Sequence, residues 1–424
     1  MQGSDAGVKA KKSKSAIKNL LLSSKGKGTG HENTASGAAT EGAGALDTSK
    51  PSAVFKPQTG RPWTLSVALP GSIINNLKNP ELKTQLAGRI ARALAVFSVD
   101  EVIIFDDAPT EISDNVKPIL QRLAKHRKES QSNIPKSDVL AEVRPDAEPW
   151  ENPDQFLYHL LTYMETPPHL RTTLFPHHSN LKWAGALQSL DMPHHMKASE
   201  WCQYREGVTL LSPSSSYALV EAGLPYPVKI PLPSDEPIEP KMRVTVKFAS
   251  ARTPPKWPNL SKKDVETLKA ELVHFIAPRE EAGYYWGYTT RRASSLSSVY
   301  QETGFDGGYD FTIATSERGV PLRSILPESK QTFAEETVKL PDSFRHLLVI
   351  FGGVAGLEPA VVNDPIFGEQ GFTKETASEA FDAWVNLVPG QGSRTIRTEE
   401  AVWIGLMGLN EYIEGHGAHW NEEG

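Results

Sequence analysis

Three turn segments of the sequence are candidates for binding a ligand through their backbone. Each follows a short apolar run and is rich in glycine or polar residues; they span residues 315–319, 351–358 and 386–398. If the apolar runs are parallel strands, these turns lie at the strands' carboxyl ends, where open α/β sheets bind ligands. Glycine lets the backbone approach a ligand closely and expose N–H groups to it. One such turn is usually a plain loop, but three in the C-terminal half predict a ligand site.

Other familiar active-site patterns are missing from the sequence. The glycines form neither GxGxxG nor GxxxxGK[ST], which disfavours a dinucleotide site and a P-loop. There is no GxSxG nucleophile turn and no paired-carboxylate signature. A single cysteine, Cys202, allows no internal disulfide and indicates a reducing, intracellular setting. Five histidines fit no zinc spacing, so we expect no metal: His169, His177, His178, His194 and His195.

The elements that would position these turns form an α/β core. The apolar run 64–69 predicts a buried strand, residues 80–97 an amphipathic helix, and residues 99–105 a second strand that ends at Asp106 and Asp107. Strand, helix and strand in this order form a βαβ unit, which predicts a parallel sheet. From residue 283 the α/β pattern returns. It predicts a helix at 289–300, strands at 309–315, 346–351 and 381–387, and a last helix at 399–413, which Thr398 caps.

Two other parts of the chain differ in composition. Residues 1–60 are rich in Lys, Ser and Gly, which predicts a disordered tail. Its lysines fit a nuclear or nucleolar address, an RNA contact or a solubilising tail, and the sequence leaves these open. Residues 203–279 have short alternating runs, which predict a small all-β insert between the two parts of the α/β domain, 61–202 and 280–424.

Charge and hydropathy exclude two broad classes of protein. The net charge of −6 excludes a uniformly basic nucleic-acid binder, although a local basic face remains compatible with it. The sequence contains no run of about 18 apolar residues, so it predicts no membrane-spanning helix. The N-terminal segment also lacks the apolar stretch of a secretory signal, so we expect no membrane partner.

Several segments make the sequence similar to SPOUT-class RNA methyltransferases. They span residues 64–413 and read TLSVALPGSIINN, ELKTQLAGRIARALAVFSVDEVIIFDD, LDMPHHMK, YREG, YYWGYTTRRASSLSSVY, GYDFTIATSERG, LLVIFGGVAGLE and NLVPGQGSRTIRTEEA. The last two, in this order near the C-terminus, resemble the archaeal and eukaryotic branch that carries an OB-fold-like insert. Residues 1–60 and 107–150 lie outside the resemblance.

The resemblance implies a parallel α/β fold with a C-terminal trefoil knot, S-adenosyl-L-methionine bound in that knot, RNA as substrate, and a homodimer. Two departures from the family pattern are a longer spacer between Gly319 and Phe344, and Leu387 where a small polar residue is usual. Carried over residue by residue, the cofactor pocket comprises Thr315, Glu317, Gly353, Gly356, Asn386, Leu387, Pro389, Gly390, Gln391, Gly392, Ser393, Thr395, Ile396 and Arg397.

Methyl transfer to a ring nitrogen that carries a proton needs a group that removes it or stabilises the anion. Arg291 and Arg292, on the predicted helix after Tyr288, are candidates for orienting the base and its phosphate, and they also fit solvated surface charge. Glu317 fits a general base or a ligand to the cofactor's charged or ribose end, and we favour the second. Three successive aromatic residues offer faces for stacking a base, although at least one belongs to the core: Tyr284, Tyr285 and Trp286.

The sequence therefore predicts an RNA methyltransferase that depends on S-adenosyl-L-methionine. The favoured substrate is ribosomal RNA at a base nitrogen, with uridine N3 suggested by related proteins. The alternative is a non-catalytic RNA-binding or ribosome-assembly factor on the same fold. An oxidoreductase is disfavoured because GxGxxG is missing. We expect the protein in the nucleus or nucleolus, with the cytoplasm as the alternative.

Overall fold

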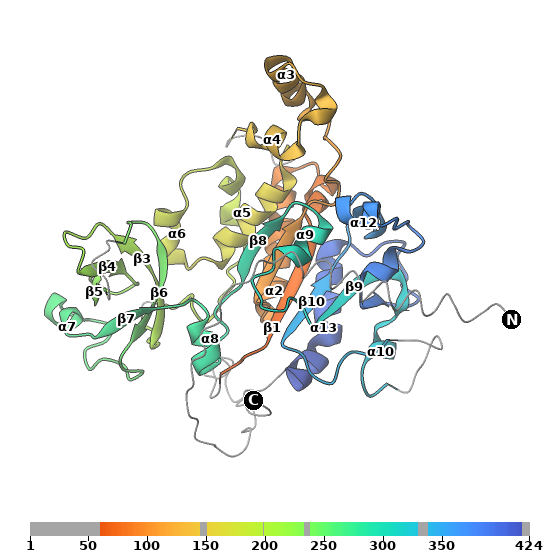
Figure 1. Ribbon diagram of the computed structural model, residues 1–424. Coiled ribbons are helices and arrows are strands. Elements are labelled where there is room, and N and C mark those ends of the chain that lie inside the picture. Colours follow the sequence, from red (N-terminus) through yellow and green to blue (C-terminus); the bar gives the residue numbers. More distant parts are fainter. Residues whose placement is uncertain (1–59, 145–150, 198, 233–237, 330–337, 418–424) are drawn as a thin grey trace.

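The computed structural model describes residues 60–144, 151–197, 199–232, 238–329 and 338–417 (Figure 1). The predicted disordered tail, apart from its last residue, lies outside the described residues. Within the described ranges, no helix has the length and apolar character that crossing a bilayer requires.

A six-stranded parallel sheet forms the centre of the fold, as the sequence predicts. Its order is β11-β9-β10-β1-β2-β8, and every neighbouring pair is parallel. The central strands β10, β1 and β2 lie buried between two helical layers, so their sequences are apolar runs rather than alternating patterns. Their bounds are β1 Thr64–Pro70, β2 Glu101–Phe105, β8 Thr289–Ala293, β9 Phe311–Pro321, β10 His346–Ile350 and β11 Ala383–Asn386.

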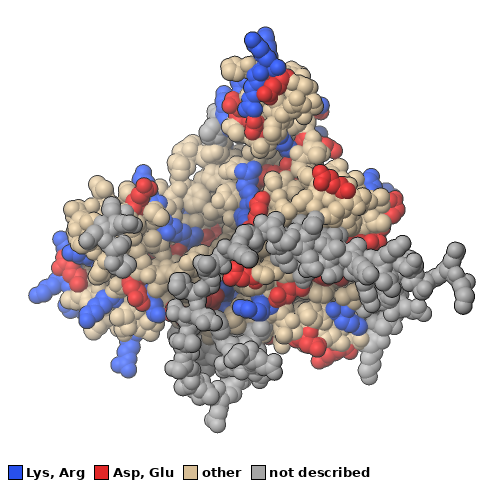
Figure 2. All heavy atoms as spheres, viewed as in Figure 1, with Lys and Arg blue, Asp and Glu red and all other residues tan. Residues whose placement is uncertain are grey.

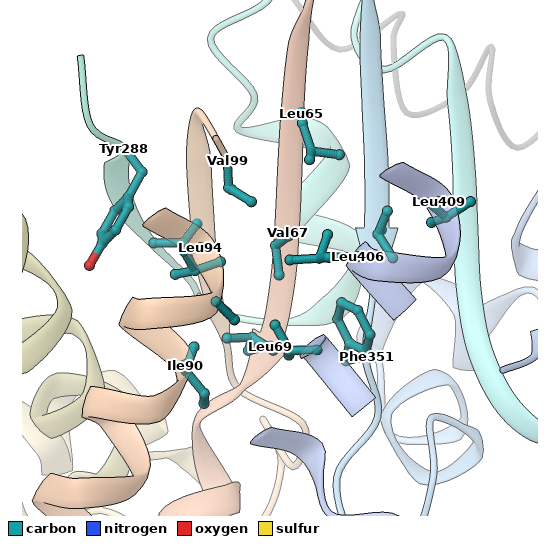
Figure 3. Close-up of a cluster of buried hydrophobic side chains, with 14 of the residues drawn as sticks. Leu65, Val67, Leu69, Ile90, Leu94, Val99, Tyr288, Phe351, Leu406 and Leu409 are labelled. Carbon is teal, nitrogen blue, oxygen red and sulfur yellow. The ribbon is translucent and has the colours of Figure 1, made fainter. Parts of the chain in front are cut away.

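Helices cover both faces of this sheet. On one face, α2 (Pro80–Val96), α5 (Pro153–Glu165) and α13 (Thr398–His416) share the main core with β1, whose Leu65, Val67 and Leu69 point toward them (Figure 3). The other face packs Ala68 and its neighbours against shorter helices. These are α9 Leu296–Gln301, α11 Glu358–Val362, α12 Pro365–Glu369 and the 3₁₀ turn η6 Ala377–Ala380.

Between β2 and α5 the chain leaves the body and forms a small helical projection (Figure 1). It comprises α3 (Lys117–Arg127), η3 (Gln131–Asn133) and α4 (Lys136–Ala141), and it has a core of its own around Leu120, Leu123 and Val139. The remaining short helices are η2 Gly71–Asn76, α6 Pro168–Leu174, η4 Ser179–Leu181, η5 Ala184–Ala186, α7 Lys262–Glu266, α8 Ala277–Ala282 and α10 Leu322–Ile325.

A separate antiparallel sheet lies beside the parallel one, within the segment predicted to be all-β (Figure 1). Its order is β5-β4-β3-β6-β7, and the outer strands β5 and β7 approach one another, so the sheet is nearly closed. The bounds are β3 Tyr204–Leu210, β4 Tyr217–Glu221, β5 Val228–Pro231, β6 Arg243–Phe248 and β7 Ala270–Val273. The exact domain boundaries, 203 and 279, stay predictions.

Two local predictions are wrong. Residues 289–300 do not form one helix: β8 pairs with β2 along the sheet edge, and α9 begins only at Leu296. Pairing with a buried strand overrides the mixed polar sequence of this segment. Thr398 does not cap the last helix either. Arg397 occupies the capping position, and the Thr398 hydroxyl donates to the carbonyl of Gly352 at 2.8 Å.

Candidate functional site

Two of the three predicted turns follow β10 and β11, whereas residues 315–319 do not form a turn: they lie inside β9, where the pairing with β11 shifts register between Trp384 and Val385. The three segments converge on one small hollow. The hollow has a volume of about 100 Å³. Ligand pockets are usually about 300–1,000 Å³, so a ligand of ordinary size must extend beyond it. The lining residues are Thr315, Ser316, Glu317, Gly352, Gly353, Gly356, Asn386, Leu387, Gln391, Ile396, Thr398 and Ala401.

Glycines shape the loop after β10, residues 351–357. The N–H of Gly356 donates to the carbonyl of Gly353 at 3.1 Å, and Gly356 has φ of +82°, which favours glycine. A Cβ at Gly352 would lie 2.8 Å from the backbone carbonyl carbon of Gly356. The loop therefore packs backbone against backbone and presents a bare surface to the hollow.

Hydrogen bonds within the chain fix the walls of the hollow. The Asn386 amide donates to the carbonyl of Glu317 at 2.7 Å and accepts from the N–H of Val388 at 3.0 Å. The Thr315 hydroxyl donates to the carbonyl of Ile350 at 3.2 Å. Asn386 thus joins the end of β11 to β9, and Glu317 is exposed where it lines the hollow.

The structure brings together most of the predicted cofactor residues. Thr315, Glu317, Gly353, Gly356, Asn386, Leu387, Gln391 and Ile396 line the hollow. Pro389, Gly390, Gly392, Ser393, Thr395 and Arg397 belong to the adjoining turn but do not line it. In that turn Gly390 has a positive φ of 76°, whereas Gly392 does not.

Four lining residues were missed by the sequence prediction: Ser316, Gly352, Thr398 and Ala401. Ser316 and Gly352 lie directly beside predicted residues, so their positions in the same turns were a usable signal. Thr398 was interpreted as a helix cap rather than as part of the site. For Ala401 the sequence carries no signal.

Arg291 and Arg292 lie at the opposite edge of the sheet, on β8. The Arg291 guanidinium donates to Glu101 at 3.1 Å and to the carbonyl of Val299 at 2.9 Å, so it ties β8 to its neighbours. Arg292 donates to the side chain of Gln155 at 3.0 Å. Within a single chain, neither arginine reaches the hollow.

The aromatic triplet is mostly structural. Trp286 is buried and its indole N–H donates to Glu206 at 2.7 Å. The Tyr285 hydroxyl donates to the carbonyl of Val99 at 2.9 Å.

The paired His194 and His195 rings both form hydrogen bonds with the backbone carbonyl of Glu165. Across the described residues, no three His, Cys, Asp or Glu side chains stand where they could hold a metal ion.

Next to the hollow, the fold gathers carboxylates from distant parts of the sequence. Asp106 and Asp107 follow β2, and the Ser72 hydroxyl donates to Asp107 at 2.6 Å. Asp154, in the first turn of α5, is buried against Gly71. Burial raises the pKa of Asp107, and burial followed by the charge of Asp106 raises the pKa of Asp154 to about 8.

Comparison with known proteins decides the family. The family described as "Putative RNA methyltransferase" matches residues 64–409, which include both sheets, the hollow and the carboxylates. The chain belongs to this RNA methyltransferase family.

Relatives of this RNA methyltransferase match along most of their length. A human protein named "28S rRNA (uridine-N(3))-methyltransferase" is 39% identical over 86% of this chain and 83% of its own. The mouse protein of the same name is 40% identical over 82% of this chain and 77% of its own. The Drosophila melanogaster protein of that name is 35% identical over 83% of this chain and 63% of its own.

Membership in a methyltransferase family implies a methyl donor, and the hollow has the backbone to hold part of one. Gly352 and Gly356 let the loop fold tightly on itself, because a Cβ at Gly352 would meet the backbone of Gly356 and a Cβ at Gly356 would meet the carboxylate of Glu358. Both glycines therefore line the hollow with backbone alone. The exposed carboxylate of Glu317 is placed at the rim, where it is accessible to the hydroxyl groups of a ligand.

Proposed function

We propose that this protein transfers a methyl group from S-adenosyl-L-methionine to a base nitrogen of ribosomal RNA, specifically uridine N3. The observation that carries the proposal is the convergence of two glycine-rich turns and a segment of β9 on one hollow in a chain of this family. The names of the human and mouse relatives supply the substrate and the atom. A nucleolar location follows from that substrate.

In this proposal the methyl donor supplies an activated methyl group, and the chain's own residues bind and orient it. The loop containing Gly352, Gly353 and Gly356 holds the adenine by backbone groups, and Glu317 holds the ribose. Asn386 keeps β9 and the end of β11 in register through its bonds to Glu317 and Val388. Such positioning is the larger part of catalysis when the donor is already reactive.

The C-terminal trefoil knot is part of the same proposal. In the sheet, β9 lies between β10 and β11, although β11 follows β10 in the chain. The connection from β10 to β11 therefore crosses β9, which supports a threaded arrangement. The hollow then lies at the crossing, where the segments of all three strands meet.

The direct test uses labelled S-adenosyl-L-methionine and large-subunit ribosomal RNA from cells that lack the protein. We expect label to enter the RNA, and mass spectrometry to find it as 3-methyluridine. A non-catalytic assembly factor would bind the RNA without transferring label, and that result would overturn the proposal.

We also propose that the antiparallel sheet helps to hold the RNA. Figure 2 shows lysine and arginine side chains gathered at its outer end, and Lys262 and Lys263 are exposed there on α7. Reversing both to glutamate should weaken RNA binding and flatten its salt dependence, because fewer counterions are released. Filter binding at several salt concentrations measures both quantities.

A charge reversal elsewhere controls for the change in net charge. Lys374→Glu, at an exposed position before η6 on the parallel-sheet side, should leave the salt slope as in the wild type. If the Lys262/Lys263 variant keeps wild-type affinity and slope while folded, the antiparallel sheet does not contact RNA.

We propose a homodimer that pairs through α2 and α13. These helices pack on each other, with Phe97 edge-on to Trp403 at 5.6 Å between ring centroids, and they expose large apolar side chains. Met407 is 67% exposed, and Leu82 and Val96 on α2 are 46% and 48% exposed. Apolar groups that gather on one surface mark association sites.

Met407→Glu should convert the dimer to a monomer, because pairing would bury an unpartnered charge. Light scattering after gel filtration measures the mass. Leu211→Glu is the matched control, since Leu211 is 81% exposed at the end of β3 and far in sequence from α13. A wild-type protein that is monomeric at the same concentration would contradict the proposal.

A further inference from the structure

A candidate proton acceptor lies at the carboxyl ends of β1 and β2, beside the hollow-lining Gly353. Methylation of uridine N3, the reaction proposed above, must remove the proton that this nitrogen carries. Neither Arg291 nor Arg292 can accept that proton, because guanidinium groups stay protonated in proteins. Glu317 is a carboxylate at the rim, but it is exposed and no described side chain orients it.

Asp107 is partly exposed and held in place. It follows β2, and the Ser72 hydroxyl donates to its Oδ2 at 2.6 Å. The carboxylate also interacts with its own backbone N–H, and no other described side chain donates to Oδ1, which leaves that oxygen available as a proton acceptor. A carboxylate oriented by one hydrogen bond and open on its other side has the geometry of a general base.

Gly353 connects Asp107 to the hollow. This glycine lines the hollow, and a Cβ built on it would stand 3.7 Å from Asp107 Oδ2, 3.6 Å from Ser72 Oγ and 3.6 Å from Pro70. Ser72 and Asp107 thus lie directly beside Gly353, although they do not themselves line the hollow. The turns after β1, β2 and β10 meet here because their strands are neighbours in the parallel sheet.

The charges around Asp107 come from four elements. Asp106, which precedes it, pairs with Lys136 of α4 at 2.6 Å. Asp154 on α5 faces the same edge, and Arg292 on β8 lies close enough to act on Asp154. Since burial raises the pKa of Asp154 to about 8, that carboxyl is mostly neutral at pH 7, and Asp107 remains as the base.

Resting on the proposed function, we infer that Asp107 accepts the proton from the ring nitrogen that is methylated. In this step the N–H proton passes to a carboxylate oxygen of Asp107, and the electron pair of the nitrogen forms the new N–C bond. The sulfonium sulfur of the donor keeps the electron pair of the broken C–S bond. Ser72 is a positioning residue, because it orients the carboxylate without reaching the acceptor.

The test compares single-turnover methyl transfer by the full-length wild type, Asp107→Asn and Asp107→Glu on ribosomal RNA from cells lacking the protein. Asparagine has nearly the same shape but accepts no proton there, so the rate should fall at least about a hundredfold. Affinity for S-adenosylhomocysteine and for RNA should change less than about twofold. The glutamate variant should recover part of the rate.

The dependence of the rate on pH separates catalysis from structure. The raised pKa of Asp107 places its ionisation closer to neutral, so the wild-type rate should rise with pH and then level off once Asp107 is ionised. In Asp107→Asn the residual rate should keep rising about tenfold per pH unit above that point, because the nitrogen must ionise by itself. Asp114→Asn changes an exposed carboxylate just before α3. It is the matched control and should behave as the wild type.

Two results would overturn the inference. One is an Asp107→Asn rate within about threefold of the wild type. The other is a variant that loses cofactor or RNA affinity together with activity, since Asp107 would then only support the structure. Failure of the proposed function looks different, because in that case the wild type itself transfers no methyl group.

Discussion

Replacing Arg243 by methionine should lower the free energy of unfolding by about 3–5 kcal/mol. Arg243, on β6, joins the antiparallel sheet to helix α5: its guanidinium donates to both oxygens of Glu165 on α5, at 2.5 and 2.9 Å, and to Glu206 on the neighbouring strand β3 at 2.6 Å. Both glutamates are buried, with 4% and 2% of their surface exposed. Methionine keeps much of the volume but leaves two buried carboxylates without their cation.

This loss should shrink as the pH falls. Burial alone would raise the pKa of Glu165, but the facing Arg243 guanidinium holds it well below its usual range. A carboxyl with a lowered pKa stabilises the fold at neutral pH, and that contribution is lost only as the pH falls through its folded pKa. Without Arg243, burial dominates and raises the pKa of Glu165 above its value in the unfolded chain. Acidification then protonates Glu165 in the variant, which removes the buried charge and reduces the loss of stability. Urea denaturation at pH 8 and at pH 5 measures the difference.

Two further variants isolate the ion pair. Arg252→Met removes an exposed arginine near the same sheet and should change stability by less than about 0.5 kcal/mol. Adding Glu165→Gln to Arg243→Met should recover part of the loss, because one buried charge disappears with it. If Arg243→Met unfolds at the same urea concentration as the wild type, the ion pairs of Arg243 with Glu165 and Glu206 contribute no net stability.

The sequence was most informative where one apolar run makes one buried strand. β1, β2 and β10 lie where continuous apolar residues predicted them, since a strand covered on both faces needs no polar alternation. β8 reads TTRRA and was mistaken for part of a helix. It is a strand because β2 offers it an open edge, and that information lies in the tertiary structure.

The candidate site divides in the same way. The turns holding Gly356, Asn386 and Gln391 could be predicted, because each follows its own strand directly in the sequence. The pairing of Asp107 with Ser72 could not, since the two residues belong to different strands that meet only in the folded sheet. No paired-carboxylate signature therefore stands out in the sequence, although the fold places Asp107 and Asp154 at one edge.

Gly392→Val should reduce the affinity for S-adenosylhomocysteine at least tenfold, which is about 1.4 kcal/mol. The hollow of about 100 Å³ is too small for the whole ligand, and we propose that the ligand extends along the turn of residues 389–393, which adjoins the hollow through Gln391. In the free protein a Cβ at Gly392 meets no atom within 4 Å, and Gly392 lacks the positive φ that would require glycine.

The unliganded fold should therefore tolerate valine, and the loss of affinity should come from the ligand alone. Calorimetric titration gives the affinity, and urea denaturation should show a change in stability below about 0.5 kcal/mol. Gly304→Val is the matched control, because a Cβ there also meets open space and Gly304 lies away from the hollow. Equal affinities for wild type and Gly392→Val would mean that the ligand does not pass under this turn. The assignment of Pro389, Gly390, Gly392 and Ser393 to the cofactor site would then be wrong, while the residues that line the hollow itself would keep theirs.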